Sequence, residues 1–114
     1  MEINKEKTYE TSFQIIMNAG DAQNAAMKAI SAAAEYDFEK ADVLIKEAKE
    51  CLKRAHNDQT EIMSREAGGA DVEVTPILMH AYDHYTMALM AVDMANMSID
   101  LNRRIDELSR AVNP

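Results

Sequence analysis

Two histidines and an aspartate lie within five residues of one another, at His80, Asp83 and His84. A neutral imidazole is a nucleophile that can attack phosphorus, and the methionines that follow would limit hydrolysis of the resulting phosphoramidate. His80 is therefore the candidate phosphoryl acceptor. His84, one helical turn further on, can position the reacting group, or it can be a core histidine with satisfied hydrogen bonds, and the sequence leaves both interpretations open.

The same residues also form the pattern H-x-x-D-H, which is close to the H-x-x-E-H of inverted zinc proteases. Those enzymes need a longer glutamate as base, a third protein ligand and a substrate cleft. A short helical bundle is not expected to supply the third ligand and the cleft, so the sequence argues against a zinc protease.

The helix that carries these residues is predicted to begin at Thr75 and Pro76. Thr75 can accept a hydrogen bond from a free backbone N–H, and Pro76 suits the first helical position. Alternating steps of three and four residues then define one stripe, which we call the seam. The seam consists of His80, Asp83, Met87, Met90, Met94, Met97 and Leu101. Such heptad spacing is typical of helices that pack along one another.

Asp83 is an unexpected residue in an apolar stripe, because a buried carboxylate must be protonated, paired or bound to a cation. If copies of the seam met around a symmetry axis, several Asp83 carboxylates would converge. A hard divalent ion such as Mg²⁺, with oxygen ligands, would relieve their repulsion better than zinc. The alternative is a buried stripe that ends in two polar residues facing solvent.

Composition narrows the class of protein. The chain has 114 residues and a formal net charge of −8, which argues against nucleic acid or an anionic membrane as its main partner. The chain has one cysteine, Cys51, so it cannot form an intrachain disulfide, and Cys51 is interpreted as a packing residue. No apolar run is long enough to span a bilayer and no signal peptide is evident, so a cytoplasmic location is expected.

Three helices are predicted, roughly over residues 8–34, 38–65 and 75–112, and they form an all-α antiparallel bundle in one domain. Asp37 can cap the second helix, and the Gly68-Gly69 pair separates the second from the third. In the first segment Gly20 costs about 1 kcal/mol of helix propensity relative to alanine, which close packing or a kink would explain. His56 and Gln59, one turn apart, are interpreted as buried hydrogen-bonding partners.

Four segments together resemble the lactose/cellobiose (chitobiose) family of enzyme IIA proteins of the bacterial phosphoenolpyruvate-dependent sugar phosphotransferase system. They span most of the chain and occur in the family's order. They are the Ile15 to Gly20 stretch, the Tyr36 to Ala41 turn, the Ala55 to Thr60 segment (similar to AHxxQT) and the His80 to His84 segment (similar to HAQDH).

The resemblance implies a homotrimer of three-helix subunits whose third helices line the axis. It implies that His80 accepts a phosphoryl group from the phosphohistidine of HPr and passes it to a cysteine of the cognate IIB component, which serves the IIC permease. It also implies that three copies of Asp83 bind a magnesium-type ion on the axis.

The chain departs from the family pattern beside these residues. Tyr82 replaces a glutamine, and Tyr85, Thr86 and Met87 stand where the family usually has Leu-Met-Thr. Two other interpretations therefore remain open. One is a regulatory trimer that has lost phosphoryl transfer, and the other is a plain helical oligomerisation domain.

Overall fold

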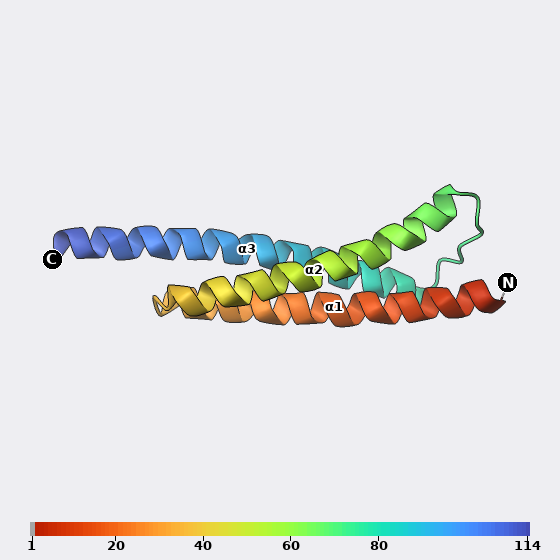
Figure 1. Cartoon of the computed structure of the whole chain (residues 1–114), viewed down its shortest axis with the longest axis horizontal. Helices are drawn as coiled ribbons and strands as arrows, with labels where there is room; N and C mark the ends of the chain where they lie inside the picture. Colours follow the sequence, from red (N-terminus) through yellow and green to blue (C-terminus); the bar gives the residue numbers. More distant parts are fainter. Residues whose placement is uncertain (1) are drawn as a thin grey trace.

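Three long helices form an antiparallel bundle in the computed structural model, which describes residues 2–114 and the side chains of residues 5–114. Helix α1 spans Glu2–Ala34, α2 spans Phe38–Ala67 and α3 spans Pro76–Val112. The molecule measures 67 × 20 × 19 Å, and α1 packs along both other helices. The C-terminal part of α3 extends past the turn between α1 and α2 (Figure 1). The predicted all-α three-helix architecture is confirmed.

The two predicted helix caps are present. The Asp37 side chain accepts a hydrogen bond from the backbone N–H of Lys40 at 3.3 Å, and Thr75 Oγ1 accepts one from Leu78 N–H at 3.2 Å. Each oxygen satisfies a donor that the first helical turn leaves free. Gly69, with φ of 97°, adopts the left-handed conformation that follows the end of α2.

Helix α1 begins at Glu2, six residues before the start that the sequence indicated. The extra turns are held by side chains as well as by the helix itself. Lys5 pairs with Glu73 at 3.5 Å and Lys7 pairs with Glu61 at 3.2 Å, while Ser12, fully buried, donates to the Thr8 carbonyl at 2.7 Å. The sequence pattern gave no sign of the two ion pairs, because Glu61 lies in α2 and Glu73 in the 68–75 loop.

The core is built mainly from alanines. Along α1 a ridge of completely buried small residues faces the other helices: Ala19, Ala22, Ala26, Ala29 and Ala33. Small side chains let helix axes approach closely, so contact area is gained from backbone proximity rather than from bulky groups. Cys51 is buried in this core, as expected of a packing residue, and burial raises the pKa of its thiol.

Close packing within the chain does not explain why α1 has a glycine at position 20. Apart from its chain neighbours and the nearby backbone of its own helix, a Cβ built at Gly20 meets no atom within 4 Å. We therefore expect Gly20→Ala to raise the free energy of unfolding by about 0.5–1 kcal/mol, because alanine loses less backbone entropy in a helix. Urea unfolding of both proteins at one concentration measures this. A lower stability of the variant would contradict the expectation and would point to a contact of Gly20 outside the single chain.

The seam on α3 lies on the surface of the subunit. Met90, Met94 and Met97 are 60%, 55% and 61% exposed, and Met87 and Leu101 are exposed as well. The buried face of α3 is a different stripe, formed by Leu78, Ala81, Ala88, Ala91, Val92, Ala95 and Ile99. The seam is therefore not a buried stripe of the chain's own core. The alternative interpretation, in which a buried stripe ends in the solvent-facing residues His80 and Asp83, is wrong for the single chain.

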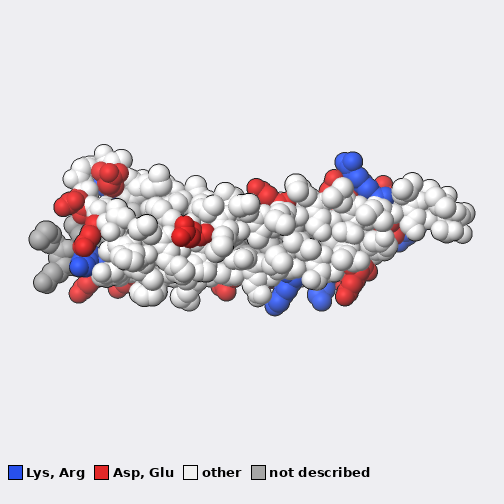
Figure 2. Space-filling view, turned by 180° about the vertical axis from the view of Figure 1, so that it is seen from behind, with Lys and Arg blue, Asp and Glu red and all other residues white. Residues whose placement is uncertain are grey.

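The face of the molecule turned away from the viewer of Figure 1, where α3 passes behind α2, is largely uncharged. Figure 2 shows scattered acidic groups there and only a few Lys and Arg side chains, one near the left end and the others in the right half of the view. Within residues 2–114, none of the helices is both long and apolar enough to cross a membrane.

Candidate functional site

His80 and His84 form a direct pair on α3. Their Nε2 atoms are 3.1 Å apart, and their rings meet edge to face with centroids 4.5 Å apart. Residues four apart lie on the same face of a helix, so the spacing in the sequence produces this contact without help from other elements. Because one nitrogen must donate and the other accept, a single proton lies between the two rings.

The surroundings of His84 indicate which ring holds that proton. Nδ1 of His84 is buried and has no hydrogen-bond partner among the described residues. Buried N–H groups without a partner are rarer than buried acceptors without one, so we assign the proton of His84 to Nε2. His84 then donates to His80, and the lone pair on Nε2 of His80 points at that donor. A ring nitrogen that accepts in this way carries a lone pair, which is what a nucleophile in phosphoryl chemistry requires.

Asp83 is exposed beside this pair, and its carboxylate forms no ion pair or hydrogen bond with a described side chain of its own chain. The premise that Asp83 is buried is wrong for a single chain, in which water solvates it. The Asp83 carboxylate would need a counter-charge only where copies of the seam meet and bury it.

A metal site confined to one chain is not formed by the described residues. They contain no group of three His, Cys, Asp or Glu side chains placed to hold an ion. His80 and His84 therefore have no third protein ligand of the kind that a catalytic zinc requires. Asp83 supplies a single carboxylate, so any ion bound there would need carboxylates from other copies.

A family model, described as the lactose/cellobiose-specific IIA subunit of the PTS system, matches residues 10–103. The chain belongs to this family. The lactose-specific EIIA component of Lacticaseibacillus casei is 38% identical over 108 residues, covering 95% of this chain and 96% of that protein. The lichenan-specific IIA component of Bacillus subtilis is 40% identical over 102 residues, covering 90% and 93%.

Solved structures agree with this assignment. The cellobiose-specific enzyme IIA of Bacillus anthracis superposes with a TM-score of 0.83 at 35% identity, covering 86% of this chain and 90% of that one. PtcA of S. mutans also gives a TM-score of 0.83, at 28% identity. The chain is thus a sugar phosphotransferase IIA component, and the resemblance inferred from its motifs is confirmed.

Tyr82 does not lie on the same side of α3 as His80 in this IIA component. Two residues correspond to about 200° of helix rotation, which turns Tyr82 toward α2. There it is half-buried and lines an apolar pocket of about 250 Å³ with Ile62 and Leu78. Burial raises the pKa of its phenol, and the nearby Arg65 partly opposes that shift. Tyr82, which replaces a glutamine of the family pattern next to His80 in sequence, therefore faces α2 and not the histidine pair in the single chain.

Tyr85 connects α3 to α2 through a contact that the sequence analysis missed. Its hydroxyl lies 3.0 Å from Nδ1 of His56. The predicted buried pair of His56 and Gln59 is wrong, because His56 is exposed and its hydrogen-bond partner is on the other helix. No short-range pattern signals this bond, because it depends on how α2 and α3 are rotated against each other. Tyr85 thus fixes α3 one residue after His84.

Proposed function

We propose that this IIA component is a phosphocarrier in sugar uptake, with His80 as the phosphoryl acceptor. Phospho-HPr is the donor, and the cysteine of a lactose/cellobiose-type IIB component, which serves a IIC permease, is the recipient. The observation that supports this most strongly is the exposed pair of His80 and His84, whose Nε2 atoms are 3.1 Å apart, with His80 assigned as the acceptor. A cytoplasmic location follows from these partners.

The first half-reaction forms one bond and breaks one. Nε2 of His80 attacks the phosphorus of phosphohistidine in HPr, the N–P bond to HPr breaks, and a new N–P bond forms on His80. A small rotation of His84 frees the lone pair of His80 for attack. The Nε2–H of His84 then remains within reach of the incoming group and can donate to one of its oxygens, which carry negative charge.

The second half-reaction restores the carrier. The IIB thiolate attacks the phosphorus on His80, an S–P bond forms as the N–P bond to Nε2 of His80 breaks, and the electron pair returns to that nitrogen as its lone pair. Nε2 of His80 is the nucleophile in the first half-reaction and the leaving group in the second. The protein therefore needs to do little more than hold the imidazole ring in place. Catalysis comes from positioning and from the hydrogen bond of His84.

The proposal includes a homotrimer whose subunits meet along the seam. Five exposed apolar side chains follow one another on one face of α3, and exposed apolar stripes of this length mark interaction surfaces: Met87, Met90, Met94, Met97 and Leu101. Asp83 lies at the end of the same stripe. Together with its copies it would hold a magnesium-type ion, which would supply positive charge against the converging carboxylates.

Transfer to IIB tests the carrier role. With phosphoenolpyruvate, enzyme I, HPr and a cognate IIB present, we expect the IIB cysteine to become phosphorylated only when this chain is added. His80→Ala is expected to stop the relay, because it removes the only proposed acceptor. Phosphorylated IIB in the presence of His80→Ala would contradict the proposal.

A further inference from the structure

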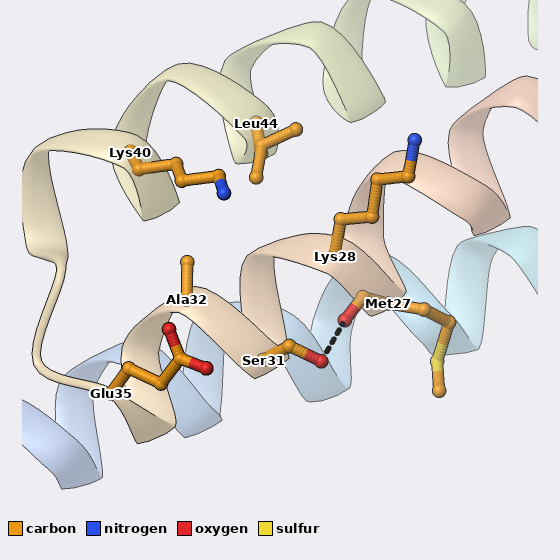
Figure 3. Close-up of a pocket in the computed structure, with 7 residues that line it drawn as sticks. All are labelled: Met27, Lys28, Ser31, Ala32, Glu35, Lys40 and Leu44. Carbon is orange, nitrogen blue, oxygen red and sulfur yellow. Dashed lines mark hydrogen bonds between the residues drawn. The ribbon is translucent and has the colours of Figure 1, made fainter.

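A groove lies between α1 and α2 near the turn that joins them. Its volume is about 600 Å³, within the range of pockets that hold small molecules. Met27, Ala32 and Leu44 supply apolar surface, and four polar side chains line the same space. Figure 3 shows that these side chains come from both walls, with Lys28, Ser31 and Glu35 on α1 and Lys40 on α2.

Two lysines place positive charge at this groove. Lys28 rises from α1 toward α2, and Lys40 extends from α2 in the direction of Leu44 (Figure 3). Within the described part of the chain neither ammonium group forms an ion pair, whereas Lys5 and Lys7 both do. Other lysines of α2 form no ion pair among the described residues either, and Lys28 and Lys40 differ from them in lining one groove from its two walls. Together they suit an anionic group with several oxygens, such as a phosphate ester.

The other polar groups suit hydroxyls. The Glu35 carboxylate accepts hydrogen bonds, and the Ser31 hydroxyl is held only loosely by its 3.4 Å hydrogen bond to the Met27 carbonyl. The apolar surface of Ala32 and Leu44 can contact the C–H face of a ring. A bare phosphate would leave Glu35 and this apolar surface unused and would be repelled by the carboxylate.

We propose that the groove binds a small phosphorylated polyhydroxy compound, such as a sugar phosphate, with Lys28 and Lys40 holding its phosphate and Glu35 its hydroxyls. The groove is remote from the histidine pair. Asp42 lies between the groove residues Lys40 and Leu44 on α2, and Arg103 of α3 contacts it at 2.6 Å. His80 is 23 residues before Arg103 on α3, which corresponds to about 35 Å along the helix. The proposal therefore does not depend on phosphoryl transfer at His80.

Titration of the wild-type protein with glucose 6-phosphate, glucose and inorganic phosphate, followed by ¹H–¹⁵N NMR, tests the site. We expect saturable shifts centred on the amides of Ser31, Glu35 and Lys40 with glucose 6-phosphate. Its affinity should exceed that of inorganic phosphate at least tenfold, and glucose alone should not saturate the site. No saturable binding would overturn the proposal, and equal affinity for phosphate would overturn the sugar phosphate as ligand.

Matched variants localise the effect. Lys28→Met with Lys40→Met should weaken glucose 6-phosphate binding at least tenfold, whereas Lys49→Met with Lys53→Met, which removes two exposed lysines elsewhere on α2, should change it less than twofold. Glu35→Gln should reduce the preference for glucose 6-phosphate over phosphate. Equal losses in the two lysine double variants would indicate general charge attraction and would overturn the site.

Discussion

Met90→Glu is expected to convert the proposed trimer into monomers. The side chain of Met90 is 60% exposed in the single chain and lies in the middle of the seam. In the trimer three glutamates would converge without counter-charges, and burying an unpaired carboxylate costs several kcal/mol per group. Sedimentation velocity at micromolar concentration measures the change. The helical content of the monomer should stay the same, because Met90 takes no part in the core of the subunit.

Two matched variants make this result specific. Asn96→Glu adds the same charge to an exposed site of α3 outside the seam and should leave the assembly intact. Asp83→Asn should make assembly insensitive to a chelator, because it removes the carboxylates that the ion neutralises. A wild-type protein that sediments as a monomer would contradict the proposed trimer. Assembly that a chelator leaves unchanged would count against a structural role for the ion.

His84→Ala is expected to slow phosphoryl transfer onto His80 about 10- to 100-fold. The variant loses the Nε2–H that lies 3.1 Å from His80 and that would donate to the phosphoryl oxygens. Hydrogen bonds to charged groups contribute about 1.5–3 kcal/mol, and each 1.4 kcal/mol corresponds to a factor of ten in rate. Rapid-quench measurement of the phosphorylation rate by phospho-HPr tests this.

His84→Gln is the informative companion, because its amide keeps an N–H donor near the same place. We expect it to recover part of the lost rate. If His84→Ala transferred at the wild-type rate, His84 would have no positioning role in the transfer. Equal defects in the alanine and glutamine variants would also count against a role for the donor.

The fold was predictable from the sequence because its determinants are local. Asp37 and Thr75 cap helices through hydrogen bonds to residues three positions away, and the three- and four-residue spacing reports helical periodicity directly. The contact between His80 and His84 follows from the same periodicity. For these features, short-range geometry was sufficient.

Features that depend on helix rotation were not predictable in this way. On α1 the alanine ridge is buried while Phe13 and Met27 are 55% and 52% exposed, although these two residues, 14 positions apart, also lie on one face of the helix. The pattern cannot tell whether an apolar stripe faces its own chain or another copy, which is why the exposure of the seam needed the structure. The pairing of His56 with Tyr85 and the groove at Lys28 and Lys40 likewise arise only when two helices are placed side by side.

The most direct test of the central claim is intact-mass spectrometry under alkaline conditions, which preserve phosphohistidine. Wild type, His80→Ala and His84→Ala would each be incubated with phosphoenolpyruvate, enzyme I and HPr. The account predicts one phosphoryl adduct per chain on wild type and on His84→Ala, and none on His80→Ala. An adduct on His80→Ala, or none on wild type with donor proteins shown to be active, would contradict it.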